Sequence, residues 1–162
     1  MGKAWKFGNS ISTDVIAPGR YFHLRSNLPE LAKHVLEPAR SEFASQVQRG
    51  DFVVAGDNFG LGSSREHAPM IIKIAGTNAV LAKSFARIFY RNCINIGLPA
   101  ITCDTDKIDE GDEIELDMEK GVVRNRTKKT ELVFSPLPPV MNRILHEGGL
   151  VAYIKAHKSL EI

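Results

Sequence analysis

The chain has 162 residues, which fits one globular domain over 1–162, and its 21 basic and 19 acidic residues exclude a histone-like or acidic-tail protein. Hydrophobic residues (43%) and charged residues (25%) have the shares of an ordered globular chain, which excludes disorder. No apolar run approaches the roughly 20 residues that span a bilayer, and no secretory signal begins the chain, so we expect a cytoplasmic protein without membrane contact.

The first predicted element is a helix in residues 28–40. Asn27 is a suitable N-cap, and Pro38 ends the strong part of the pattern. The apolar residues recur at helical spacing and form one buried stripe, made of Leu28, Leu31, Ala32, Val35 and Leu36.

Strands and helices then alternate. Buried strands are predicted at 52–55, 79–83 and 99–103, each a short apolar run. A helix follows each of the first two strands: one begins at a capping box of Ser63 and Glu66, and the other runs from a Ser84 cap to Gly97. This order predicts an α/β fold with a parallel or mixed sheet covered by helices.

The last third of the chain has a different pattern. Three short antiparallel strands are predicted, with sequences EIELDM, GVVRNR and ELVFS, whose acidic and basic residues would face one another as a solvated surface. After the prolines at 136, 138 and 139, a short helix is expected to end at Gly148 and Gly149. The segment LVAYIK is predicted to close the chain as a strand.

The loop between the strand at 52–55 and the following helix carries the strongest functional signal. Gly60 and Gly62 let the backbone turn tightly and approach a ligand. Arg65 adds a bidentate donor for a carboxylate or a phosphate, beside the positive end of a helix. The spelling excludes a Walker loop and a GxGxxG dinucleotide site. An anion site and a plain helix cap at Ser63 both stay open from the spacing alone.

A second polar stretch lies near the beginning of the chain. Asp14 stands among small polar residues, and Arg25 follows the turn at Pro18–Gly19. Each has a bland interpretation, Asp14 as a turn or cap residue and Arg25 as an exposed arginine. The two cysteines, Cys93 and Cys103, are too few for an iron–sulfur cluster, which takes about four cysteine ligands, so we expect no metal in this chain.

Three segments together carry a family resemblance. GDNFGLGSSREHAP (56–69), AKSFARIFYRNCINIGLPAI (82–101) and STDVIAPGRYF (12–22) resemble the small subunits of 3-isopropylmalate dehydratases in the aconitase superfamily. The resemblance covers the chain from about Phe7 to Tyr153. It implies an aconitase-type swivelling β/β/α domain, with a mixed sheet flanked by helices.

The resemblance also implies an activity. Members are hydro-lyases that remove and re-add water on a small hydroxy acid, and they act only with a large subunit that holds a 4Fe-4S cluster. No cofactor is then bound by this chain. Leucine biosynthesis and 3-isopropylmalate are the leading pathway and substrate that it implies.

The family motif assigns roles to residues of this sequence. Ser63 matches the base that takes a proton from the carbon next to a carboxylate, while Ser64 and Arg65 match positions that bind substrate carboxylate. Asp14 matches an acidic active-site position, and Arg25 resembles an arginine that grips a carboxylate in aconitase-like members. His67 matches the motif either as a supporting or as a structural residue.

The segment after STDVI corresponds to the family's specificity loop. Tyr21, Phe22 and Leu24 could meet an isopropyl group, whereas Arg25 could read an extra carboxylate. Homoaconitase-type and citramalate or 2,3-dimethylmalate dehydratases are therefore alternatives. A stand-alone anion-binding or regulatory module is an alternative of another class. The net charge of only +2 argues against nucleic acid as a partner.

Overall fold

The computed structural model describes residues 1–63 and 65–157. Its strands form one mixed sheet in the order β4-β3-β2-β1-β5-β6-β7. The parallel part comprises β1 (Gly2–Lys6), β2 (Phe52–Val54), β3 (Ala79–Ala82) and β4 (Ala100–Thr102). The antiparallel part comprises β5 (Glu113–Asp117), β6 (Val122–Asn125) and β7 (Thr130–Val133). The predicted fold class, a mixed sheet with flanking helices, is confirmed.

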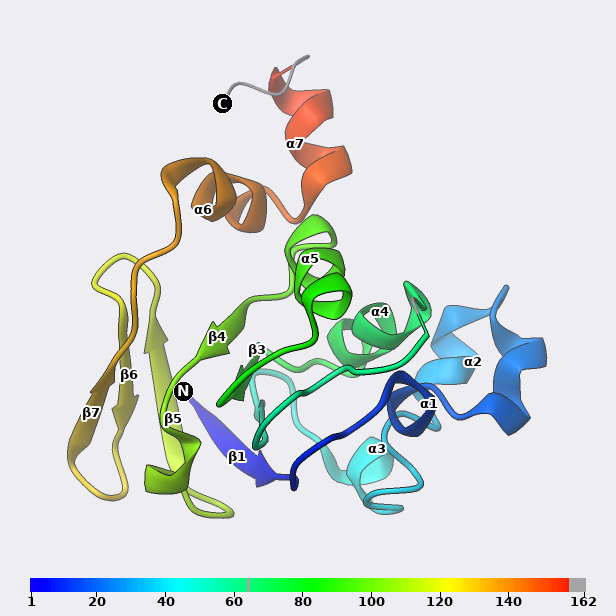
Figure 1. The fold of residues 1–162 in the computed structure, drawn as a ribbon, viewed down its shortest axis with the longest axis horizontal. Coiled ribbons are helices and arrows are strands. Elements are labelled where there is room, and N and C mark those ends of the chain that lie inside the picture. Colours follow the sequence, from blue (N-terminus) through cyan, green and yellow to red (C-terminus); the bar gives the residue numbers. More distant parts are fainter. Residues whose placement is uncertain (64, 158–162) are drawn as a thin grey trace.

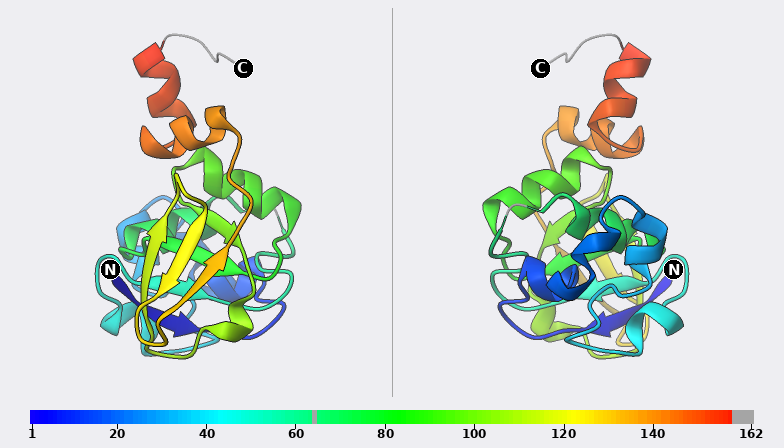
Figure 2. Two further views of the ribbon diagram at one scale, coloured as in Figure 1. Left: turned by 90° about the vertical axis from the view of Figure 1, so that its left-hand side faces the viewer. Right: turned by 90° about the vertical axis from the view of Figure 1, so that its right-hand side faces the viewer.

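The helices gather on one face of the parallel strands, and β5–β7 curl toward the other face (Figures 1 and 2). This is the arrangement expected when successive parallel neighbours are joined by right-handed crossovers in one direction. The helices between strands are α1 (Thr13–Ile16), α2 (Leu28–Ala32), α3 (Phe43–Gln46), α4 (His67–Ile74) and α5 (Arg87–Asn95). Short 3-10 helices occupy Gly19–Leu24 and Thr105–Lys107.

Successive residues of the buried strands contribute alternately to two hydrophobic cores. Val53 and Val80 belong to the core under the helices, whereas Phe52, Val54 and Leu81 belong to the core under β5–β7. Side chains of a strand point alternately to its two faces, so strands covered on both faces read as continuous apolar runs. This explains why the sequence predicts β2, β3 and β4 correctly.

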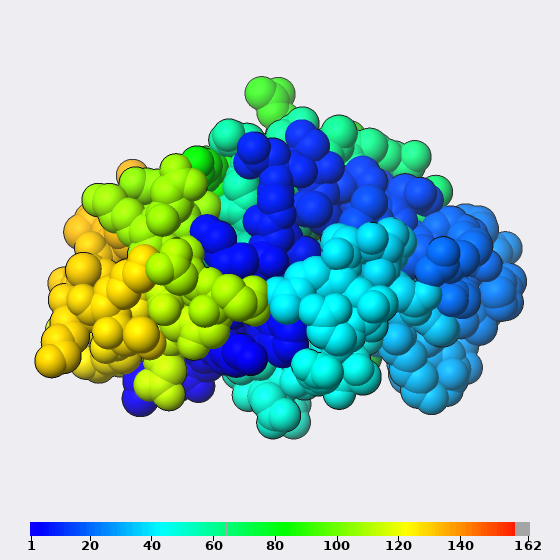
Figure 3. Space-filling view, turned by 90° about the horizontal axis from the view of Figure 1, so that it is seen from below, coloured from blue at the N-terminus to red at the C-terminus, as the bar shows by residue number. Residues whose placement is uncertain are grey.

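One strand is absent from the sequence prediction. β1 lies in the middle of the sheet, between β2 and β5, although only two of its five residues, Ala4 and Trp5, are apolar and buried. Figure 3 shows this first segment in blue between the cyan segments and the yellow-green antiparallel segments. Asp51 holds it in place, since its carboxylate accepts hydrogen bonds from the Lys3 amide and the Trp5 indole.

The C-terminal end differs most from the prediction. The short helix before Gly148 is confirmed as α6 (Pro139–His146), but the segment LVAYIK is α7 (Leu150–His157) and not a strand. Tyr153 of α7 is fully buried with Ile94 of α5 and Ile144 of α6, so packing on these helices decides its conformation. A short apolar run cannot distinguish a strand from a helix by its period alone.

Three predicted helix boundaries are also wrong. α4 begins at His67 with Glu66 in the N-cap position, so Ser63 and Glu66 do not form a capping box. α5 begins after Ala86, and the Ser84 hydroxyl instead accepts a hydrogen bond from the Asn58 amide. The helix predicted at 28–40 is regular only to Ala32, although its Asn27 cap is confirmed.

Candidate functional site

Loops that follow three neighbouring parallel strands meet at one edge of the sheet. The glycine-rich loop at 56–62, after β2, lies between the other two and is bonded to both. Its Gly60 amide donates to the Ile11 carbonyl at 2.7 Å, and the Thr13 amide donates back to the Leu61 carbonyl at 2.9 Å. On its other side the Phe59 amide donates to the Ser84 carbonyl at 3.0 Å. The carboxyl ends of parallel strands are where α/β folds place their ligand sites.

Gly60 is required by both backbone conformation and space. Its φ of +86° is unfavourable for any residue with a side chain. A Cβ atom there would come within 2.1 Å of the Phe89 ring of α5. The loop therefore passes directly against α5, and together they enclose a hollow.

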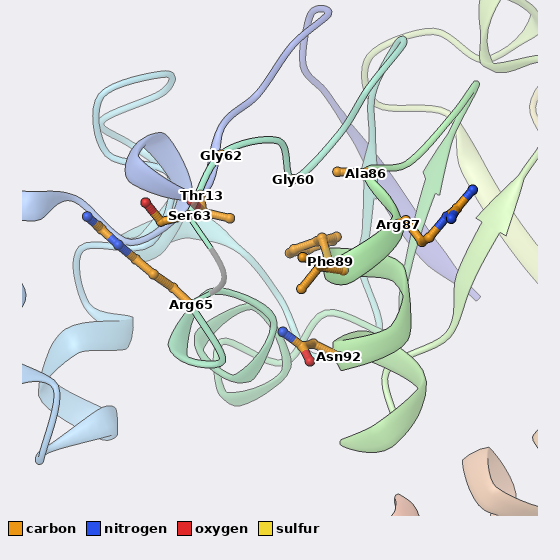
Figure 4. A pocket seen from close by; sticks show the side chains of 10 residues that line it. Thr13, Gly60, Gly62, Ser63, Arg65, Ala86, Arg87, Phe89 and Asn92 are labelled. Carbon is orange, nitrogen blue, oxygen red and sulfur yellow. The ribbon is translucent and has the colours of Figure 1, made fainter.

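The hollow has a volume of about 210 Å³. Its walls come from the loop after β1, the glycine-rich loop and the beginning of α5, and the lining residues are Thr13, Gly60, Gly62, Ser63, Arg65, Ala86, Arg87, Ile88, Phe89 and Asn92. Figure 4 shows Ser63 and Arg65 on one side and Phe89 and Asn92 on the other. Asn92 points toward the space between them, while Arg87 points away from it.

Arg65 is fixed by the loop after β1. Its Nη1 donates to Asp14 Oδ1 at 3.2 Å and to the Ala17 carbonyl at 3.1 Å. Asp14 is held in turn by the Gly19 amide, which donates to the same oxygen at 3.1 Å. Asp14 lies in the first turn of α1, and 69% of its side chain is exposed. The arrangement holds a charged guanidinium in a defined place beside the hollow, against the loop after β1.

Ser63 ends the glycine-rich loop as an exposed residue and lines the hollow. Because α4 begins only at His67, its hydroxyl is not used to cap that helix. Ser63 and Arg65 both line the hollow, and Figure 4 shows the Arg65 guanidinium turned away from Phe89 and Asn92. A hydroxyl and a guanidinium on one side of a hollow suit an anionic ligand. The predicted substrate residue Ser64 lies outside the described residues.

The residues of the predicted specificity loop point in different directions. The Tyr21 ring stacks on His34 with centroids 3.6 Å apart, and its hydroxyl donates to Glu37. Leu24 packs partly buried against the helix-side core. Phe22 is 45% exposed and comes near the site, because the Arg65 guanidinium lies 5.6 Å from its ring.

Arg25 stands outside the hollow. Its guanidinium lies 4.6 Å from the Phe22 ring and donates a hydrogen bond to the Phe22 carbonyl at 3.2 Å. His67 contacts Phe22 edge to face at a centroid distance of 6.2 Å. Phe22 is therefore the one predicted specificity residue that connects Arg25 with Arg65.

Sequence reasoning assigned no role to Thr13, Phe89 or Asn92. All three line the hollow. The signal that could have found them is their place after β1 and β3, since residues that follow neighbouring parallel strands converge at one edge.

The residues present do not fit an iron–sulfur cluster. Cys93 is buried in the helix-side core and Cys103 in the core under β5–β7, on opposite faces of the sheet. Burial raises the pKa of both thiols, that of Cys103 to about 12, so neither is a ready thiolate ligand. Within 1–63 and 65–157, no three His, Cys, Asp or Glu residues cluster to hold a metal. No helix in these ranges is long and apolar enough to span a membrane.

Comparison with known proteins agrees with this architecture. Residues 26–106 match the aconitase C-terminal domain. The 3-isopropylmalate dehydratase small subunit 2 of Archaeoglobus fulgidus is 64% identical over 100% of this chain and 98% of its own. Small subunit 1 of Thermotoga maritima is 62% identical over 98% of this chain and 96% of its own. The crystal structure of 3-isopropylmalate dehydratase (leuD) from Methanocaldococcus jannaschii has a TM-score of 0.92 at 44% identity, covering 97% of this chain and 93% of that one.

The curled mixed sheet and its match to known structures thus define an aconitase-type swivelling domain. Within that class, the chain belongs to the family of 3-isopropylmalate dehydratase small subunits. The family expected from the sequence motifs is confirmed.

Proposed function

We propose that this chain is the small subunit of a hydro-lyase that converts 2-isopropylmalate to 3-isopropylmalate in leucine biosynthesis. Residues 1–162 act as one swivelling domain that closes over a large subunit. The observation that carries the proposal is the hollow that Ser63 and Arg65 both line, with Arg65 fixed by Asp14. A large cluster-bearing subunit supplies the iron chemistry, because the thiols of this chain do not fit a cluster.

Ser63 is assigned the proton transfer. In the dehydration, its alkoxide takes the proton from the carbon next to a substrate carboxylate, the C–H electrons form the double bond, and the hydroxyl leaves the neighbouring carbon as hydroxide, which the iron chemistry of the large subunit would accept. Serine is a weak base in water, so this needs positive charge and fixed donors nearby. Arg65, which lines the same hollow, supplies that charge. In the rehydration, the Ser63 hydroxyl gives the proton to the carbon that lost the hydroxyl group, while hydroxide adds to the carbon that lost the proton.

Arg65 and Ser64 are assigned the substrate carboxylate, with the loop at Gly60 and Gly62 shaping the space around it. Asp14 positions Arg65 through the bond at 3.2 Å. A planar guanidinium binds a carboxylate through two parallel hydrogen bonds, which fixes the substrate against Ser63.

The variable group of the substrate is assigned to the surface of Phe22, with Tyr21 and Leu24 supporting it from the core side. The Phe22 ring, 45% exposed, suits an alkyl group, whereas Arg25, whose guanidinium lies 4.6 Å from that ring, would suit an additional carboxylate. The alternative substrates, homocitrate, citramalate and 2,3-dimethylmalate, belong in the same assay.

The test is anaerobic co-expression with the large 3-isopropylmalate dehydratase subunit of the same organism. Turnover of the four substrates is followed by absorbance of the unsaturated intermediate. We expect 3-isopropylmalate to react fastest with the pair and neither subunit to react alone. A pair with an intact cluster and no turnover would contradict the proposal and favour a binding module, while homocitrate as the best substrate would move Arg25 into the site.

Ser63→Ala is the matched variant for the base. It should lower turnover by about 10²–10⁴-fold while the pair still forms, since removal of a general base costs this much. Ser45→Ala is the control, because Ser45 is an exposed serine of α3 far along the chain from the hollow. Full activity of Ser63→Ala would remove the base assignment.

A further inference from the structure

The exposed face of α5 carries an apolar residue between two arginines. Arg87, Ile88 and Arg91 are all exposed, whereas Phe89 and Cys93 of the same helix are buried. Ile88 is 52% exposed, which is unusual for a large aliphatic side chain beside a functional hollow. Arg87 points away from the hollow rather than into it (Figure 4). Contacts with the body of the domain therefore do not account for this face.

The charges of this face are also unbalanced. Arg87 and Arg91 lie four residues apart on one helix, where like charges repel, and neither has an ion pair with the rest of the described chain. Many other cations of the chain are paired with acids over short distances: Arg20, Lys33, Arg40, Arg65, Lys83, Arg124, Arg126 and Lys128. Two like charges at this spacing slightly disfavour the helix, and no acid of the described chain offsets them with an ion pair.

We propose that Arg87, Ile88 and Arg91 dock an acidic surface with an apolar centre on the large subunit. The inference rests on the proposed function, since it names where that partner sits. Arg87 and Ile88 also border the hollow, so a chain seated on this face would cover the site beside Ser63. Arginines around an apolar anchor are typical of interface centres, where they gain affinity from desolvated ion pairs.

A second copy of this chain fits the face poorly. A two-fold pairing presents the same patch from both sides, which would bring arginines of one copy toward arginines of the other. A partner with carboxylates is complementary in charge. Such pairing would accelerate association and make it sensitive to salt.

The test measures association with the purified large subunit by sedimentation or titration at low and at high salt. Arg91→Glu should weaken binding by about tenfold or more at low salt, with a smaller effect at high salt, because a charge pair becomes a repulsion. Turnover at saturating large subunit should equal that of the unchanged pair, since Arg91 does not line the hollow. The double variant Arg87→Glu/Arg91→Glu should weaken binding further.

Arg49→Glu is the matched control. Arg49 is an exposed arginine without an ion pair in the described ranges. It lies in the loop before β2, at the amino ends of the parallel strands, whereas the hollow lies at their carboxyl ends. Its reversal should leave binding unchanged. Folding of every variant is checked by circular dichroism, and a glutamate at position 87 suits the first turn of a helix.

Several results would overturn the inference. Unchanged affinity of both α5 variants, or an equal loss in Arg49→Glu, would show that this face does not dock the partner. A raised KM at saturating large subunit would assign Arg91 to the substrate instead. Self-association of the unchanged chain that Arg91→Glu abolishes would assign the face to a second copy. Because binding is measured without turnover, an inactive pair would count against the proposed activity alone.

Discussion

Arg65 and Asp14 are 51 positions apart in the chain and meet at 3.2 Å, joining the segment between the glycine-rich loop and α4 to the first turn of α1. The contact is made by one oxygen of Asp14, which also accepts the Gly19 amide. The carboxylate thus ties together two loops that border the hollow. It holds the guanidinium by charge and geometry together.

Removing the charge of Asp14 should displace the Arg65 guanidinium while leaving that side chain present. We expect Asp14→Asn to lower kcat/KM by about 100-fold, the scale of a misplaced binding group. Asp57→Asn is a suitable control, because Asp57 is an exposed residue of the same glycine-rich loop without an ion pair in the described chain. Steady-state kinetics of the assembled enzyme measures both, and equal kinetics of Asp14→Asn and the unchanged enzyme would show that Arg65 needs no anchor.

Glu37 anchors the predicted specificity loop. It accepts hydrogen bonds from His34 Nδ1, the Tyr21 hydroxyl and Arg20, and the bond from His34 is the main cause of a pKa below the ordinary 4.5. A lowered pKa in the folded state stabilises the fold above the unfolded value, and this contribution disappears as the pH falls through the folded value.

We therefore expect Glu37→Gln to lower the melting temperature at pH 7 and to make progressively less difference as the pH falls below 4.5 and through the lowered pKa of the folded state, where the native carboxyl is protonated too. Thermal denaturation across this range measures the effect. Glu30→Gln is the matched control, since Glu30 lies in α2 and, within the described residues, forms an ion pair with the exposed Lys33 alone. A loss for Glu37→Gln that persists at acid pH would mean that shape rather than charge holds the loop.

Gly60 offers a test of how closely the loop and α5 are packed. Gly60→Ala combines a positive φ with overlap on Phe89, and we expect it to cost about 2–4 kcal/mol in the free energy of unfolding. Gly148→Ala has a similar φ of +93° and open space around the added methyl, so it should cost only about 1 kcal/mol. Urea denaturation distinguishes them. Equal costs would mean that Phe89 moves aside freely.

The thiols should be unreactive in the folded chain. Burial raises the pKa of Cys103 to about 12 and that of Cys93 also upward, so little thiolate exists at pH 8. Alkylation followed by mass spectrometry should modify neither cysteine under native conditions and both in denaturant. Rapid native labelling at Cys93 would show that the helix-side core opens readily.

The sequence predicted the parts of the fold whose pattern is local. β2, β3 and β4 are apolar on both faces, and β5–β7 carry opposed charges that the structure pairs, with Arg124 bonded to Glu131 and Arg126 to Glu115. β1 was not predicted because lysines flank its two apolar residues and because the strands that pair with it are distant in sequence. The segment of α7 was wrongly predicted as a strand because its apolar run suits either a strand or a helix. Its packing against α5 and α6 decides between the two.

The site was predictable in its residues and not in its geometry. The motifs singled out Ser63, Arg65 and Asp14, but only the fold shows that two of them share a hydrogen bond. The capping interpretation of Ser63 was wrong because the turn at Arg65–Glu66 delays the beginning of α4. Asn92 could be found only through the convergence of loops at one edge of the sheet.

The central position of β1 has a consequence for how the chain acquires its shape during synthesis. Ala4 pairs with Phe52, and Gly2 with Ile114, so the strand made first waits for partners that emerge much later. Contacts so distant in sequence slow folding, because a long segment must be ordered before they form. Until β1 has paired with these strands, the loop that carries Asp14 and follows β1 is not anchored to the sheet. The hollow takes its lining from residues 13 to 92, so a nascent chain can complete it only after α5 has been made.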